Sequence, residues 1–265
     1  MIGLCRFSYP AIGGFQITHD DAAERARYLY EPARLEARFR FFEHVTLPCL
    51  RAQTDPDFTF LVVTGDDLPL WARERLYDLL SDLPQAVIRA HAPGPHRTVM
   101  QQAINRLRGD SSQPCLQFRL DDDDAVNLRF VERLRRVAGD AGALAARHRF
   151  LAIDFNHGHL LCPGPEGLRA AAVKRAYWAP ALAMLARPGE RLTVMNFNHA
   201  RIWQHMPTLT RTDPDMFVRG VSPMNDSGFH GDAPLALLDV AGETLFRQAF
   251  GICADQLRKG YRAVV

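Results

Sequence analysis

The sequence lacks the features that mark several large classes of protein. No stretch of its 265 residues is apolar for long enough to span a membrane, and Arg6 interrupts the apolar N-terminus too early for a signal peptide. Lys and Arg number 32 and Asp and Glu 30, so the net charge of +2 gives no reason to expect a nucleic-acid partner. We therefore expect a cytoplasmic protein without a transmembrane segment, for which peripheral contact with a membrane stays open.

Cysteine is also scarce. This pattern favours reduced thiols and argues against a structural zinc site, because the cysteines are odd in number, widely spread and without a Cys-x-x-Cys pair. No glycine-rich loop of the G-x-x-x-x-G-K-[ST] type is present, which counts against phosphate chemistry of the P-loop kind. The five cysteines are Cys5, Cys49, Cys115, Cys162 and Cys253.

The first half of the chain alternates between expected strands and helices. Apolar runs rich in β-branched and aromatic residues predict strands, and apolar residues three or four positions apart predict helices. Such alternation predicts a largely parallel sheet with helices on both faces. The strands are expected at residues 1–8, 58–63, 85–90 and 115–120, and the helices at residues 20–53, 69–81, 98–108 and 126–137, with Pro48 breaking or kinking the first helix.

The second half has a different character. Residues 149–155 and 158–162 predict a hairpin around His157-Gly158, and residues 243–259 predict a C-terminal helix. Residues 207–234 are rich in Pro, Gly, Asp and Asn, which is typical of a loop. We expect this loop to close over a bound ligand and exclude water from the reaction.

Four adjacent aspartates, residues 121–124, directly follow the strand expected at residues 115–120. Carboxylates this close repel one another, more strongly when they are partly buried. In parallel α/β sheets ligands bind beyond the carboxyl ends of strands, where Mg²⁺ or Mn²⁺ would neutralise the cluster. The alternative is an acidic helix N-cap, because Asp and negative charge are both favoured there. A cap accounts for one or two of the aspartates but not for four.

The segment Arg119-Leu120-Asp121-Asp122-Asp123-Asp124-Ala125, followed by Phe130-Val131, resembles the R-L-D-x-D-D-A signature of the putative rhamnosyltransferase family of bacterial glycosyltransferases. Residues 38–50 and the stretch Gln53-Thr54-Asp55-Pro56-Asp57-Phe58 are similar to another segment of that family. The resemblance covers most of the chain and is strongest over residues 34–135.

This resemblance implies an α/β fold of the GT-A type, a Rossmann-like twisted mixed sheet flanked by helices. The chain would form a single domain over residues 1–265. Within it, residues 1–140 would bind a nucleotide sugar, and residues 141–265 would supply a β-rich acceptor half and the C-terminal helix.

The resemblance also implies roles for individual residues. Asp121-x-Asp123 aligns with the D-x-D motif of GT-A enzymes, and Asp66 and Asp67 stand where that layout contacts the nucleoside. Arg97 precedes a helix where a basic residue can contact the donor, although a solvated loop arginine is an equal alternative. The residues expected to bind the donor are Asp66, Asp67, Arg97, Arg119, Asp121 and Asp122, and those expected to hold Mn²⁺ or Mg²⁺ are Asp121, Asp123 and Asp124.

An inverting transferase also needs a carboxylate or a histidine to take the proton of the acceptor hydroxyl. The sequence does not choose among the candidates, and a hydrogen-bonded structural role is the alternative for His199. Trp178 and Trp203 would either stack on a sugar or belong to the core. The candidate bases are Asp226, His199 and Asp154, with Asp213 and Asp215 as further carboxylates.

The sequence therefore predicts transfer of a sugar from a nucleoside-diphosphate donor to a hydroxyl group of a saccharide or glycolipid acceptor, with rhamnose suggested by the family. One alternative is a nucleotidyl- or phosphotransferase that uses a carboxylate-held metal. Another is a non-catalytic carbohydrate-binding protein with the same fold. Hydrolysis of the donor by the purified protein would separate an enzyme from a binding protein.

Overall fold

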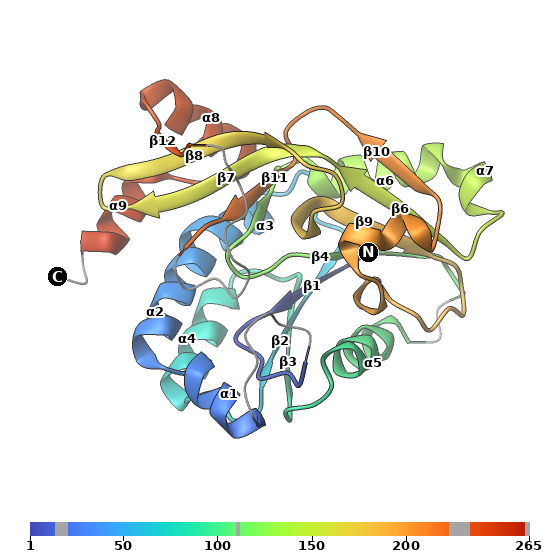
Figure 1. Ribbon diagram of the computed structural model, residues 1–265, viewed down its shortest axis with the longest axis horizontal. Coiled ribbons are helices and arrows are strands. Elements are labelled where there is room, and N and C mark those ends of the chain that lie inside the picture. The colour runs from blue at the N-terminus through green and yellow to red at the C-terminus, as the bar shows by residue number, and fades with distance from the viewer. Residues whose placement is uncertain (14–20, 110–111, 223–233, 263–265) are drawn as a thin grey trace.

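Two β-sheets form the centre of the computed structural model, which describes residues 1–13, 21–109, 112–222 and 234–262. Figure 1 shows the smaller sheet above the larger one. The larger sheet has the strand order β10-β6-β9-β4-β1-β2-β3 and consists of β1 (Ile2–Arg6), β2 (Thr59–Gly65), β3 (Ala86–His91), β4 (Cys115–Arg119), β6 (Phe150–Phe155), β9 (Leu182–Ala186) and β10 (Thr208–Arg211). The smaller sheet has the order β12-β8-β7-β11-β5 and consists of β5 (Ala125–Val126), β7 (His157–Gly164), β8 (Gly167–Lys174), β11 (Phe217–Gly220) and β12 (Ala236–Leu237).

The strand β1 lies inside the larger sheet and pairs in parallel with β2 on one side and with β4 on the other. All three strands are apolar and almost fully buried, as expected for parallel strands covered on both faces. The chain moves outward from β1 to β2 and β3, then returns to β4 on the other side of β1. Ligands bind beyond the carboxyl ends of strands at such a switch in strand order, so the topology favours a binding site at this edge.

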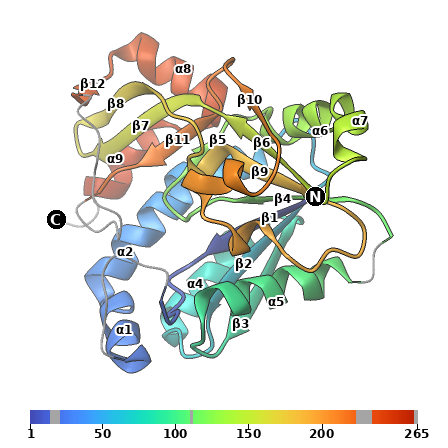
Figure 2. The ribbon, with the colours of Figure 1, turned by 45° about the vertical axis from the view of Figure 1, so that its right-hand side comes forward.

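Helices cover both faces of the larger sheet, as Figures 1 and 2 show for α2 and α4 on one side and α5 on the other. Phe39 of α2 (Pro32–Phe41), Leu76 of α4 (Leu70–Leu80) and Phe130 of α6 (Phe130–Asp140) share one buried cluster with Phe60 and Phe118. Met100 and Ile104 of α5 (His96–Arg108) pack with Leu4 and Leu61 in a second cluster. In the described ranges, no helix is long and apolar enough to cross a membrane.

The helix expected over residues 20–53 is divided into several pieces. It consists of α1 (Ala22–Leu29), α2, the π-helix η1 (Phe42–Thr46) and α3 (Leu47–Arg51). Pro32 begins α2, where a missing N–H costs nothing because first-turn amides have no helical partner. Pro48 was expected to break or kink this helix; the helical segment continues past it, because Pro48 lies in the first turn of α3, directly after the π-helix.

The hairpin predicted over residues 149–155 and 158–162 is wrong. β6 pairs with β9 and β10 in the larger sheet, and β7 pairs with β8 and β11 in the smaller one. The chain therefore passes from one sheet to the other at Asn156, and the true hairpin joins β7 to β8 through Gly164 and Gly167. Local sequence pattern identified both strands but not their partners.

Two predictions near the C-terminus also need correction. Within residues 207–234, β10 and β11 are strands that pair with β6 and β7, so this segment is not a continuous loop. Its residues 223–233, which were expected to close over the ligand, lie outside the described residues. The expected helix at residues 243–259 is two helices, α8 (Val240–Phe250) and α9 (Ala254–Arg262), because Gly251 takes a left-handed φ of +73° and ends α8.

The predicted fold class is confirmed, with a mixed sheet flanked by helices and a β-rich second half. The antiparallel strand β9 makes the sheet mixed rather than parallel throughout. The two halves, residues 1–140 and 141–265, are interleaved in space. The second half supplies β6, β9 and β10 to the larger sheet, and the first half supplies β5 to the smaller one.

Candidate active site

The carboxyl ends of β1 and β4 bring Arg6 and Asp121 together. Arg6 is the last residue of β1, and its Nη2 donates to Oδ1 of Asp121 at 2.9 Å. Arg119 ends β4, and its Nη2 lies 3.5 Å from Oδ2 of the same carboxylate. Burial alone would raise the pKa of Asp121, but the charges of Arg6 and Arg119 outweigh it and lower that pKa. Asp121 is therefore an ionised group held between two guanidinium groups at the switch in strand order.

Arg38 of α2 holds the next two aspartates. Its Nε donates to Oδ2 of Asp122 and its Nη1 to Oδ2 of Asp123, both at 3.0 Å, and its Nη2 also contacts Oδ1 of Asp122. The Asp122 residue is only 2% exposed, so its charge requires a partner of this kind. The repulsion expected among the adjacent carboxylates is compensated by arginines that are distant in the sequence.

Asp124 is fixed by neutral groups instead. The hydroxyl of Thr46, in η1, donates to its carbonyl at 2.8 Å, and the amide of Gly220, in β11, donates to its Oδ1 at 3.1 Å. Burial, followed by the charge of Asp123, raises the pKa of Asp124 well above the ordinary value. A Cβ on Gly220 would lie 2.2 Å from the carbonyl oxygen of Asp123, so only glycine lets β11 approach the aspartate turn this closely.

The helix-cap interpretation of the aspartates is wrong. The helix expected at residues 126–137 begins at Phe130, with Arg129 as its N-cap, and Ala125 and Val126 form β5 instead. β5 pairs antiparallel with β11, so residues 121–124 form the turn between strands of two different sheets. Capping explains none of the four carboxylates.

The fit of this turn to a metal ion depends on the kind of site. Among residues 1–13, 21–109, 112–222 and 234–262, no group of three or more His, Cys, Asp and Glu side chains is arranged to hold a metal. Mg²⁺ usually takes one or two carboxylates, with substrate phosphates and water completing the shell. Asp123 and Asp124 fit such a shared site, because the charge of Asp123 acts on Asp124 and a cation would relieve their repulsion.

Asp66 and Asp67 lie beyond the carboxyl end of the neighbouring strand β2, and both are exposed. The hydroxyl of Tyr30 donates to Oδ1 of Asp67 at 2.6 Å, and the amide of Asp66 donates to the carbonyl of His91 at 3.1 Å. Arg97 is exposed in the first turn of α5. These three of the six residues predicted to bind the donor therefore follow strands that end at the same edge as β1.

His96, the residue before Arg97, is part of the same edge. Its Nε2 lies 3.1 Å from Nη1 of Arg6. Burial, and then the charges of Arg6 and Arg119, lower the pKa of His96 to about 3. The ring is therefore neutral at physiological pH and can accept a hydrogen bond from the guanidinium group.

The candidate bases lie in different environments. Nδ1 of His199 lies 2.6 Å from the carbonyl oxygen of Tyr177, and burial, followed by the charge of Arg119, lowers the pKa of His199. The charges of Arg219 and Asp121 also act on this ring, so it lies within electrostatic range of the aspartate turn. Asp154, at the end of β6, is 0% exposed, and burial raises its pKa to about 6. Asp226 lies outside the described residues.

The other residues considered from the sequence are two further aspartates and two tryptophans. Asp215 pairs with His159 at 3.0 Å, and Asp213 is exposed in the preceding turn. The ring of Trp178 faces the guanidinium groups of Arg175 and Arg219, at 5.3 and 5.2 Å, and Trp203 is largely exposed.

Sequence reasoning did not select Arg6, Arg38, His96, Tyr177 or Arg219 for the site. A signal existed for Arg6, because a charged residue ends an apolar strand just as the aspartates follow one. No local signal marks Arg38, which lies 84 residues from Asp122 in the sequence.

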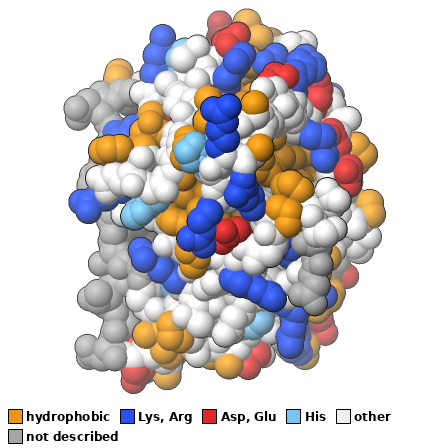
Figure 3. All heavy atoms as spheres, turned by 90° about the vertical axis from the view of Figure 1, so that its right-hand side faces the viewer, with side chains coloured by type: hydrophobic (Ala, Val, Ile, Leu, Met, Phe, Trp, Pro, Cys, Tyr) orange, Lys and Arg blue, Asp and Glu red, His pale blue; other side chains and the backbone are white. Residues whose placement is uncertain are grey.

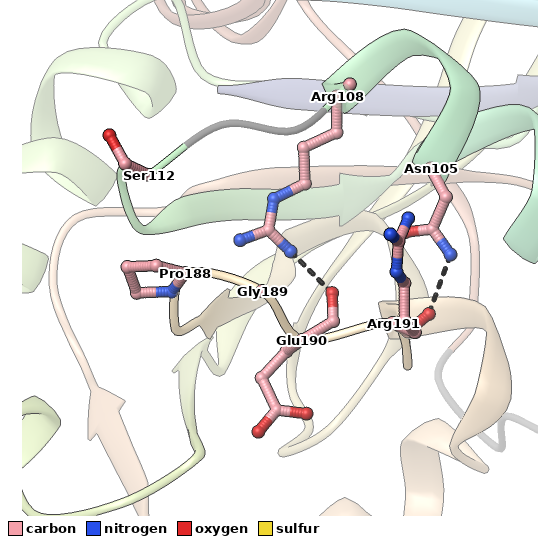
Figure 4. Close-up of a pocket in the computed structure, with 8 residues that line it drawn as sticks. Asn105, Arg108, Ser112, Pro188, Gly189, Glu190 and Arg191 are labelled. Carbon is pink, nitrogen blue, oxygen red and sulfur yellow. Dashed lines mark hydrogen bonds between the residues drawn. The ribbon is translucent and has the colours of Figure 1, made fainter.

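A pocket at the opposite edge of the sheet is a separate feature. Its lining includes Asn105, Arg108, Glu190 and Arg191, and Ala186, just before it, pairs with Cys115, the first residue of β4. Figure 4 shows Arg108 and Asn105 donating to the carbonyl groups of Glu190 and Arg191. On this side of the molecule, Figure 3 shows basic side chains gathered around a small acidic surface. Arg108 therefore holds the loop after β9.

Comparison with known proteins places the chain in a family. The family model described as putative rhamnosyl transferase matches residues 1–233. The chain belongs to this family. Its members are described as transferases, and the match includes the aspartate turn, Arg6, Arg38 and His199. No curated protein matches the sequence significantly.

Solved structures that resemble the chain are distant. S. aureus TarS 1-349 in complex with UDP is 11% identical, with a TM-score of 0.40 over 84% of this chain and 61% of that one. Its complex with UDP-GlcNAc is 11% identical, with a TM-score of 0.41 over 86% and 60%. UDP-glucose pyrophosphorylase complexed with UDP-glucose is 8% identical, with a TM-score of 0.30 over 99% and 97%. The chain therefore spans less than two thirds of the TarS fragment, and no substrate follows from these likenesses.

Proposed function

We propose that the protein transfers a sugar from a nucleoside-diphosphate donor to a hydroxyl group of a saccharide or glycolipid acceptor. Rhamnose is the sugar suggested by the family's description. The observation that carries the proposal is the aspartate turn at the carboxyl ends of β1 and β4, between two sheets and among arginines. Carboxylates bind cations, and guanidinium groups bind anionic oxygens. Such a mixed set of charges would therefore bind a cation together with a ligand that carries several anionic oxygens.

The proposed donor site runs along the carboxyl edge of the larger sheet. Asp66 and Asp67 would contact the nucleoside beyond β2, and Asp121 and Asp122 would lie along the ribose and diphosphate. Arg6, Arg97 and Arg119 would donate to phosphate oxygens, for which guanidinium groups are well suited. Arg6 and Arg119 are already fixed by Asp121, so little side-chain freedom would be lost on binding.

We propose that Mn²⁺ or Mg²⁺ is shared between the aspartate turn and the donor. Asp123 and Asp124 would hold it, with Asp121 beside them. The cation would stabilise negative charge on the leaving diphosphate. Arg38 keeps the carboxylates of Asp122 and Asp123 oriented, so the chain itself holds this part of the proposed metal site in place.

His199 is the base that the contacts favour. A carbonyl oxygen only accepts hydrogen bonds, so Nδ1 of His199 carries the proton that it donates to Tyr177. Nε2 is then left with a lone pair. Because burial and the charge of Arg119 lower the pKa of His199, the ring is neutral at pH 7 and can take the proton of an acceptor hydroxyl.

The five cysteines are free, which supports a reducing compartment such as the cytoplasm.

The function is tested by measuring the melting temperature with UDP-glucose, UDP-N-acetylglucosamine, GDP-mannose and dTDP-rhamnose, each with Mn²⁺ or with EDTA. We expect at least one donor to stabilise the protein in Mn²⁺, followed by slow release of its nucleoside diphosphate. Stabilisation without any release would indicate a binding protein, and no stabilisation by any donor would contradict the proposal.

A further inference from the structure

Tyr177 has a backbone conformation that residues other than glycine rarely adopt. Its φ is +62°, in the segment between β8 and the short helix η2 (Ala179–Ala181). A bulky residue in this region costs free energy, and it persists only where the surroundings hold it.

Two hydrogen bonds hold the main chain of Tyr177, one on each side of its Cα. Its amide donates to Oδ1 of Asp154 at 2.8 Å, and its carbonyl accepts from Nδ1 of His199 at 2.6 Å. Asp154 lies in β6, and His199 begins η4 (His199–Gln204). A single residue thus connects a carboxylate of the larger sheet to the imidazole ring of His199.

Asp154 is placed for this contact rather than for contact with a substrate. It is 0% exposed, between its strand partners Leu182 in β9 and Thr210 in β10. Burial raises its pKa to about 6, and the bond from the Tyr177 amide opposes that rise. A carboxylate with no exposed surface has no path to an acceptor hydroxyl, yet the carboxylate remains bonded to the backbone next to the proposed base.

We propose that Asp154 is a positioning residue, which holds the left-handed main chain of Tyr177 and thereby fixes the tautomer and orientation of the His199 ring. The role of His199 as the base rests on the proposed function, but its hydrogen bond to Tyr177 does not. The main chain of Tyr177, and not its phenol, carries the effect.

The direct test is nuclear magnetic resonance of the imidazole nitrogens in protein labelled with ¹⁵N-histidine, with His199→Gln identifying the signal of residue 199. In the wild type we expect the Nδ1–H tautomer, since a carbonyl acceptor requires it. Asp154→Ala should move the signal toward a mixture of tautomers. Asp154→Asn should keep the wild-type signal, because its amide oxygen still accepts from Tyr177. An unchanged signal in Asp154→Ala would overturn the proposal.

Variants at Tyr177 keep the test open if Asp154→Ala fails to fold. Glycine adopts a positive φ without cost, so Tyr177→Gly should preserve the wild-type tautomer of His199. Tyr177→Val should lose it, because a β-branched residue strongly disfavours this conformation. If the two variants give the same signal, the main chain of Tyr177 does not position the ring.

Turnover of whichever donor the stability screen identifies separates this inference from the proposed function. We expect Asp154→Ala to lower kcat about 10- to 100-fold with KM nearly unchanged, as for a misplaced base, and Asp154→Asn to lose far less. Full activity in His199→Gln would show that His199 is not the base, but it would not contradict the positioning of its ring by Asp154. Inactive His199→Gln beside fully active Asp154→Ala would overturn the positioning role alone.

Discussion

At the scale of single residues, the aspartate turn is held by cations from distant parts of the chain. Arg6 and Arg119 compensate Asp121, whereas Arg38 compensates both Asp122 and Asp123. Asp124 accepts hydrogen bonds from the neutral groups of Thr46 and Gly220, and burial and the charge of Asp123 raise its pKa although the charge of Arg219 lowers it. The distribution of charge therefore differs along four residues of identical type, and each one should respond differently to substitution.

Arg38→Ala should be strongly destabilising. It leaves two buried carboxylates without their partner, which typically costs about 3–5 kcal/mol. Arg136→Ala is the matched control, because Arg136 pairs with Glu132 on an exposed helix surface, where such a pair contributes about 0–1 kcal/mol. Urea unfolding of both variants measures the difference. Equal losses of stability would show that the aspartate turn does not need its guanidinium partner.

The raised pKa of Asp154 predicts that the stability of the protein depends on pH. Its folded pKa of about 6 lies above the unfolded value, so the native state binds more protons than the unfolded state between these two values. Stability from this group is present at low pH and is lost as pH rises through about 6. Asp154→Asn removes the titration. Relative to the wild type, it should therefore gain about 2–3 kcal/mol between pH 4 and pH 8. A difference that stays constant across urea melts at these pH values would contradict this assignment.

Whether a site residue could be predicted from the sequence depends on how close along the chain the residues that explain it lie. The aspartates were recognisable because repelling charges after an apolar strand need a ligand or a partner. Their arginine partners were not, because Arg6 lies 115 residues from Asp121 and Arg38 lies 84 residues from Asp122. The left-handed Tyr177 is also invisible in sequence, since nothing in the residue type suggests it.

At the scale of elements, strands and helices in the first half were predictable because each has its own apolar period and is buried on the side that this period indicates. The errors concern partners and ends. β6 and β7 were both found, but which sheet a strand joins depends on residues far along the chain. Val126 was assigned to a helix, but it belongs to β5, and the helix begins only at Phe130.

The approach of β11 to the aspartate turn gives an element-scale prediction. Gly220→Ala would place a Cβ 2.2 Å from a main-chain oxygen, and neither strand can move away cheaply. We expect a loss of about 1–3 kcal/mol, together with weaker donor binding because Asp123 and Asp124 shift. In contrast, Gly139→Ala in α6, where a Cβ meets nothing within 4 Å, should stabilise by about 0.5–1 kcal/mol. Thermal unfolding of both variants checks the contrast in sign.

At the scale of the whole molecule, the site is built from both sheets and both halves of the chain. The larger sheet supplies Arg6 and Arg119, the smaller one supplies Gly220, and the segment after β9 supplies His199. Because β5 pairs with β11 and β4 pairs with β9, the aspartate turn is complete only when the second half has folded against the first. Binding of the proposed donor at this site would therefore be coupled to the stability of the entire fold.

That coupling allows the metal proposal to be tested by unfolding alone. A ligand at 100 times its dissociation constant stabilises the native state by about 2.7 kcal/mol. We expect the identified donor to give a shift of this order in Mn²⁺ and almost none in EDTA. The variant that tests the metal site is Asp123→Asn, in which a neutral amide replaces a carboxylate ligand suited to hard cations.

Without metal, Asp123→Asn should change stability little, because losing the charge opposite Arg38 is offset by relief of the repulsion on Asp124. In Mn²⁺ the variant should lose the donor-induced shift, whereas Asp82→Asn, at an exposed ion pair with Arg51, should keep it. A shift equal in Mn²⁺ and EDTA would instead mean that Arg6, Arg38 and Arg119 neutralise the diphosphate themselves, and that Asp123 serves only to orient Arg38.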